Sequence, residues 1–201
     1  MRSVIFFKRI INTLVACHNA VFQVDPITAS RINNEIADSH VKKGRIDDAI
    51  KTYKKVLATD PDNATALFRL AKLYKSRGVS AEALDLLKKL VLRDENNPEA
   101  FYLLGKVYYS IDATKEAWDA LSRASALDPD YADVYYEMAT IAEARKEHES
   151  AIRLFQKSIN LRPDFVKAYQ GLGFVYEGRG MRKEAVKYFR KSLEIEHKKP
   201  I

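Results

Sequence analysis

Five alanines recur along this chain at one fixed interval. A period of 34 residues indicates repeated supersecondary units, because a unit this short cannot bury its apolar face alone and must stack on its neighbours. The interval therefore favours a solenoid of stacked units over an ordinary domain with one central core. The alanines that carry the period are Ala49, Ala83, Ala117, Ala151 and Ala185.

Other positions of the repeat carry side chains of matching size. With each alanine taken as position 20, position 8 is small in every unit, as Ala37, Ala71, Gly105, Ala139 and Gly173. Position 24 is large, as Tyr53, Leu87, Leu121, Phe155 and Phe189. Small residues let two helix backbones approach closely, and large ones fill the space that remains. The pattern resembles the tetratricopeptide repeat (TPR), which implies an all-α fold of antiparallel helix pairs wound into a right-handed superhelix, or α-solenoid.

The repeat frame predicts the units of the chain. We expect an N-terminal amphipathic docking or oligomerisation helix in residues 1–29. Position 15, between the two helices of a unit, favours left-handed backbone and is glycine in three repeats. Asp112 and Lys146 replace it in the other two, and Asp tolerates that conformation better than Lys. The five TPR units are expected at residues 30–63, 64–97, 98–131, 132–165 and 166–201.

Two features depart from the regular pattern. Proline stops the second helix at position 32 of three repeats, but the second repeat has Glu95 there. This predicts one of two things. The junction between repeats two and three is slightly different and could act as a hinge, or the change is a neutral variation of a tolerant loop. After the fifth repeat no further helix is expected, so Val186 and Leu193 should be exposed and should favour end-to-end association.

Charge and composition limit the classes of function. The net charge of +7 is uneven, because residues 1–29 carry +2 and the five repeats carry +1, +3, −3, −1 and +5. A nucleic-acid-binding protein would show one continuous basic face, so we expect no nucleic-acid partner. The one cysteine, Cys17, cannot form an internal disulfide or a zinc site. No phosphate-binding loop or catalytic motif is present, so we predict neither an enzyme nor a cofactor or metal.

The residues before the first repeat have an amphipathic pattern. Apolar residues recur with helical spacing, and no acidic residue precedes Asp25. Lys8 and Arg9 argue against a membrane span, and a transit peptide fits poorly. A helix lying on a membrane surface and a helix docked on a TPR surface remain, and we favour docking, on the same chain or on another copy. The predicted self-association face consists of Phe6, Ile10, Leu14, Cys17 and Val21.

The first helix of each TPR unit lines a concave groove through positions 2, 5, 9, 12 and 13. In the middle repeats these positions combine aromatic residues with lysines, and the groove turns acidic toward its end. Such a surface suits an amphipathic helix or an extended peptide, and the alternative is an ordinary solvated helix face. Asn34 and Asp38 disfavour the clamp with which chaperone-cofactor TPRs hold a C-terminal carboxylate. The predicted partner-binding residues are Phe68, Lys72, Lys75, Tyr102, Lys106, Tyr109, Tyr136 and Glu143.

Beyond the repeat itself, the chain resembles the MamA family, TPR proteins of bacterial magnetosomes. The resemblance is strongest in DFVKAYQGLGFVYEGRGMRKEAVKYFRKSLE (164–194), is weaker in HVKKGRIDDAIKTYKKVL (40–57), and includes AVFQVD just before the first repeat. It implies a peripheral scaffold on the cytoplasmic side of the magnetosome membrane. Such a scaffold self-assembles into homo-oligomers and recruits other magnetosome proteins through its groove and outer face. The N-terminal helix would enter a neighbour's groove, against Phe68, Tyr102 and Tyr136.

Two classes of function follow. The leading hypothesis is a self-assembling protein-interaction scaffold in biomineralisation. The alternative is a monomeric TPR adaptor or chaperone that binds a peptide of a secretion or pilus assembly machinery. The two hypotheses differ in the oligomeric state that they require.

Overall fold

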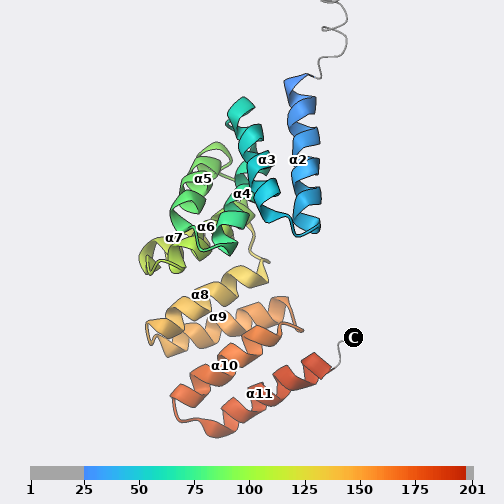
Figure 1. Ribbon diagram of the computed structural model, residues 1–201. Helices are drawn as coiled ribbons and strands as arrows, with labels where there is room; N and C mark the ends of the chain where they lie inside the picture. The colour runs from blue at the N-terminus through green and yellow to red at the C-terminus, as the bar shows by residue number, and fades with distance from the viewer. Residues whose placement is uncertain (1–24, 198–201) are drawn as a thin grey trace, which may run out of the picture. The chain divides into compact units, whose positions relative to one another are not determined.

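The structure is a computed structural model that describes residues 25–197 (Figure 1). These residues form ten α-helices, α2 to α11, and contain no strand. The all-α fold that the repeat predicts is therefore confirmed. The predicted N-terminal helix and its face (Phe6, Ile10, Leu14, Cys17 and Val21) lie outside the described residues. The helices are α2 (Pro26–Lys42), α3 (Ile46–Thr59), α4 (Ala64–Ser76), α5 (Ser80–Arg93), α6 (Pro98–Tyr109), α7 (Thr114–Leu127), α8 (Ala132–Ala144), α9 (His148–Leu161), α10 (Val166–Gly178) and α11 (Arg182–His197).

The chain divides into two compact units, one that ends at Ala66 and one that begins at Leu67. In the first unit α2 packs on α3. In the second unit each helix from α5 to α11 packs on the next one along the chain, and α8 also contacts α6 and α10 (Figure 1). Helices that are neighbours in sequence are therefore neighbours in space, as a stack of antiparallel helix pairs requires.

The small residues of the repeat lie where the two helices of a pair meet. The alanines at position 20 are buried, with an exposed fraction of 0% for Ala49, Ala83, Ala117 and Ala151 and 3% for Ala185. The residues at position 8 are buried as well. Large apolar side chains such as Leu87 and Leu121 complete the core of the second unit. The predicted roles of small and large positions are confirmed.

Left-handed backbone occurs at position 15 of all five repeats. The φ angle is 71° at Gly44, 72° at Gly78 and 73° at Gly180, and it is 59° at Asp112 and 60° at Lys146. Glycine adopts this conformation without a steric cost, whereas a side chain there meets the following carbonyl oxygen. Asp112 and Lys146 therefore hold strained backbone, as the sequence predicts.

The residue that ends α5 has nearly the same backbone conformation as those that end α3 and α7, which favours the neutral variation of the two alternatives. The residue that ends the helix has φ −127° and ψ 83° at Asp94, against −135° and 82° at Asp60 and −132° and 94° at Asp128. Two hydrogen bonds to the Asp94 side chain hold this turn without a proline. The Asp94 carboxylate accepts from the Asn97 side chain at 3.0 Å and from the Asn96 backbone N–H at 3.3 Å. This turn holds the junction although Glu95 replaces the proline.

The last helix leaves apolar side chains uncovered, as expected. Val186 and Leu193 on α11 are 54% and 53% exposed. Along residues 25–197, no helix combines the length and the apolar character that a membrane span requires.

The strained turn at Lys146 generates a stability prediction. We expect Lys146→Gly to raise the free energy of unfolding by about 1 kcal/mol, because glycine removes the clash of a left-handed side chain. Asp112→Gly should gain less, since Asp tolerates this backbone better. Urea unfolding followed by circular dichroism measures both. In the control Gly180→Ala, the free energy of unfolding should fall by about 1–2 kcal/mol. If Lys146→Gly leaves the free energy of unfolding unchanged, the backbone at Lys146 is not strained.

Candidate partner-binding groove

The helices α6, α8 and α10 line a groove in the second unit. It contains two adjoining cavities of about 360 and 240 Å³, and both are lined by Tyr136 and Lys167. The first cavity includes the predicted residues Tyr102 and Lys106, and the second includes Glu143. The structure thus brings together four of the eight predicted groove residues, because the helical repeat puts positions 5, 9 and 12 on one side of the stack.

The other four predicted residues lie outside these cavities. Lys75 is half-buried near Lys106, and burial followed by the charge of Lys106 lowers its pKa. Tyr109 is half-buried, and burial followed by the charge of Glu143 raises its pKa. Phe68 packs on the apolar core formed by α5 and α6, and Lys72 is exposed. These four residues stay a prediction as partner-binding residues, since they do not line the two cavities.

A triad of polar side chains occupies the middle of the groove. Lys106 Nζ lies 2.5 Å from Glu137 Oε1 and donates a hydrogen bond of 3.2 Å to the Tyr102 hydroxyl. That hydroxyl donates to Glu137 Oε1 at 3.4 Å. Burial disfavours the charged form of Lys106, but the hydrogen bond and the charge of Glu137 outweigh it and raise the pKa of Lys106. The triad is thus an internally neutralised element that fixes the Tyr102 ring.

Aromatic side chains from the turns between repeats extend this floor. The Tyr131 ring lies 5.0 Å from the Tyr102 ring, and the Phe165 ring lies 5.1 Å from the Tyr136 ring, each at an interplanar angle of 41°. Both pairs join position 5 of a repeat to position 34 of the same repeat. In the first unit these two positions hold Asn34 and Asn63, whose side chains share a hydrogen bond of 3.1 Å. The 5–34 pair is therefore a recurring contact that is polar in repeat one and aromatic in repeats three and four.

Sequence reasoning missed the residues that these turns contribute. Arg162 forms an ion pair with Asp133 and lies over the Phe165 ring, 4.2 Å from its centre. Lys167, which lines both cavities, lies on α10 at position 2, a groove position of the repeat, but is not among the predicted residues. Arg162 and Phe165 occupy positions 31 and 34, which lie between α9 and α10 and outside the helix positions that predict the concave face. The signal that could have found them is the change at position 34 from Asn63 and Asn97 to two aromatic residues.

The groove changes character toward α10. Phe174 is 59% exposed and lies edge-on to Phe189, with ring centres 5.1 Å apart. Glu143 and Glu177 are also exposed. An aromatic floor with an acidic rim can bind an amphipathic helix whose polar face is basic. Among residues 25–197, no group of His, Cys, Asp or Glu side chains is placed to hold a metal ion.

Comparison with known proteins agrees with this fold. Residues 40–107 match one family model described as "Tetratricopeptide repeat", and residues 132–165 and 166–198 match another with the same description. The chain is therefore a TPR protein, and TPR proteins act as non-enzymatic protein-interaction scaffolds, as the sequence predicts. Comparison with curated protein sequences gives no match.

Solved structures define the family more narrowly. A crystal structure of MamA is 45% identical, with a TM-score of 0.74 over 81% of this chain and 95% of that one. A second is 44% identical, with a TM-score of 0.74 over 84% and 92%. The chain belongs to the MamA family of magnetosome-associated TPR proteins. MamA from Desulfovibrio magneticus RS-1 shares the fold, with 22% identity and a TM-score of 0.78 over 89% and 99%.

The aromatic floor generates a pH prediction. Burial, followed by the neighbouring Tyr102 and Asp133, raises the pKa of Tyr131 from 10.0 to about 12. Because the folded-state pKa is the higher one, the stabilising contribution is complete below pH 10 and is lost as the pH rises toward 12. We expect Tyr131→Phe to reduce the alkaline loss of stability, measured by unfolding at several pH values. In a titration followed by phenolate absorbance, the variant should lose the signal of one tyrosine that titrates near pH 12. A titration curve identical to that of the wild type would contradict the raised pKa of Tyr131.

Proposed function

We propose that this chain is a scaffold that self-assembles into a homo-oligomer and recruits other magnetosome proteins. Its N-terminal segment enters the groove of a neighbouring copy. The units are the five repeats at residues 30–63, 64–97, 98–131, 132–165 and 166–201, behind the docking segment at 1–29. The scaffold is peripheral, on the cytoplasmic side of the magnetosome membrane. Membership of the MamA family supports the magnetosome as its location.

The observation that carries the proposal is the aromatic groove of α6, α8 and α10. Tyr102 and Tyr136 are half-buried there, and the adjoining Phe174 is mostly exposed. Large apolar side chains that stay open to solvent at the floor of a groove are typical of sites that bind a helix or peptide. The first unit offers less for such binding, since Asp38 in its groove accepts a hydrogen bond of 2.6 Å from the Tyr53 hydroxyl.

Charge supports the N-terminal segment as the occupant. Residues 1–24 contain Arg2, Lys8 and Arg9 and no acidic residue. Glu143 lines the second cavity and is exposed, and Glu177 is exposed on α10 three residues after Phe174. A basic amphipathic helix brings apolar residues to the floor and cations to these glutamates, so the two surfaces are complementary. Two of the groove's cations are neutralised, because Lys106 pairs with Glu137 and Arg162 pairs with Asp133, and Lys167 is a further cation at the cavities.

The oligomeric state tests the proposal. In size-exclusion chromatography with light scattering, we expect the full chain to be a large oligomer at tens of micromolar. Ile10→Asp with Leu14→Asp should reduce it toward a monomer, because a carboxylate in the docking face cannot be buried without a partner. Phe174→Asp should do the same from the groove side.

Leu92→Asp is the matched control for the groove variant. Leu92 is 76% exposed on α5, so the substitution adds the same charge at an apolar surface residue away from the cavities. It should leave the oligomer unchanged. A wild-type chain that is monomeric at this concentration would refute self-assembly and favour the monomeric adaptor. Equal loss in both variants would show that charge alone, and not the groove, controls assembly.

A further inference from the structure

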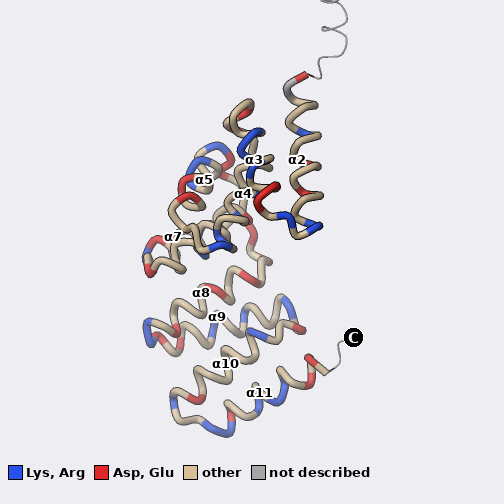
Figure 2. The backbone as a smooth tube through the Cα atoms, in the orientation of Figure 1, with Lys and Arg blue, Asp and Glu red and all other residues tan. Residues whose placement is uncertain are grey.

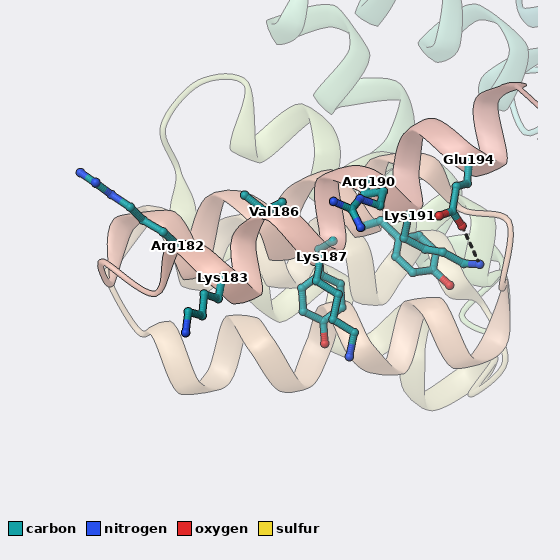
Figure 3. A pocket seen from close by; sticks show the side chains of 9 residues that line it. Arg182, Lys183, Val186, Lys187, Arg190, Lys191 and Glu194 are labelled. Atoms are coloured by element: carbon teal, nitrogen blue, oxygen red, sulfur yellow. Dashed lines mark hydrogen bonds and ion pairs between the residues drawn. The ribbon is translucent and has the colours of Figure 1, made fainter.

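The exposed half of α11 carries an unusual number of cations. At 3.6 residues per turn, the side that faces away from the buried Ala185 and Ser192 presents Lys183, Lys187, Arg190 and Lys191, and Arg182 is exposed at the start of the helix. Glu194 is the acidic residue on the same side. Figure 2 shows these cations along the helix, and Figure 3 shows their side chains at the surface of α11. They border a cavity of about 730 Å³ that Tyr169, Val186 and Tyr188 also line.

The repeat frame shows that three of these five charges are not needed for folding. The same positions of α9, one repeat earlier, hold His148 for Arg182, Glu149 for Lys183 and Gln156 for Arg190. The positions of Lys187 and Lys191 keep their charge there, as Arg153 and Lys157. The packing of α9 and that of α11 follow the same repeat, so a helix at this place does not require a cation at the three positions that differ. A terminal helix that only keeps a solenoid soluble would carry both signs of charge. The three cations that α11 has beyond those of α9 therefore require another explanation.

Most of these cations have no carboxylate partner among residues 25–197. Lys191 pairs with Glu194 at 3.3 Å, and no other cation of this side of α11 lies in an ion pair within the described part of the chain. The groove differs, because its central cations are paired. Beside the cations, Val186 and Leu193 are each more than half exposed. The exposed surface of α11 thus has cations without a carboxylate partner among the described residues and, beside them, exposed apolar side chains.

We propose that this side of α11 docks the chain on an anionic phospholipid surface, an inference that rests on the peripheral membrane association of the proposed function. The cations from Arg182 to Lys191 extend over about 14 Å of helix. A fluid bilayer brings a phosphate to each cation without a fixed register. Val186 and Leu193 and the two tyrosines then lie at headgroup level, where such side chains are favourable. An acidic protein would need carboxylates at matching fixed spacings.

Vesicle co-sedimentation of the full chain tests the proposal. We expect binding to vesicles of phosphatidylcholine with phosphatidylglycerol, weak binding to phosphatidylcholine alone, and a loss of binding as salt rises. The triple variant K187Q, R190Q and K191Q should bind the anionic vesicles on the order of 100-fold more weakly, from a factor of about five for each cation. All three side chains are exposed, so circular dichroism should be unchanged.

The matched control is K51Q, K54Q and K55Q on α3. These lysines occupy the same three repeat positions, are exposed, and lower the net charge by the same three units. This control should bind within about two-fold of wild type. Equal losses in both variants would mean that net charge alone drives binding and would overturn the α11 surface. Absence of wild-type binding to anionic vesicles would also overturn it.

Light scattering on the same variants separates this inference from the proposed self-assembly. We expect the α11 variant to keep the wild-type oligomeric state while it loses vesicle binding. A smaller oligomer would mean that a second copy covers α11, and the lipid proposal would then fail. Wild-type chains that assemble but do not bind vesicles would refute α11 docking and leave the scaffold proposal intact. Monomeric chains that bind vesicles through α11 would refute the scaffold alone.

Discussion

The structure depends on the close approach of two helix backbones at positions 8 and 20 of each repeat. There is little room at this contact. A Cβ added to Gly105 would lie 2.7 Å from Cγ of Leu121, and one added to Gly173 would lie 2.5 Å from the Phe189 ring. Each such contact sets the distance between the two helices of a pair. Because the sequence repeats it every 34 residues, it also places positions 5, 9 and 12 of α6, α8 and α10 along one groove.

This contact explains why most of the fold is predictable from the sequence. It joins residues 12 apart, such as Gly105 and Ala117, so local pattern and local packing agree. The same holds for the left-handed residue between the helices, where even Lys146 keeps the required φ. At the junction that contains Glu95 the absence of proline leaves the sequence ambiguous, because proline is not the cause of the turn. The side-chain acceptor Asp94 is sufficient to hold it.

The groove was only partly predictable, for a physical reason. Tyr102, Lys106 and Tyr136 lie on helices, where the position in the repeat determines the direction of a side chain. Arg162 and Phe165 come from a turn, and their place depends on contacts with a helix about 30 residues away in sequence. The effective charge of the groove was harder still to predict from the sequence. Lys106 and Arg162 count as two positive charges in the composition, but Glu137 and Asp133 neutralise them in the structure.

The groove and the exposed side of α11 differ in how their charges are paired. In the groove, ion pairs neutralise Lys106 and Arg162, while Glu143 and Glu177 are exposed. On α11 the cations face solvent, and the cavity there shares no lining residue with the two groove cavities. One copy can therefore hold a neighbour in its groove while α11 stays free. A single basic helix binds a membrane weakly, but an assembly presents many copies at once, so self-association multiplies the strength of attachment without any new contact.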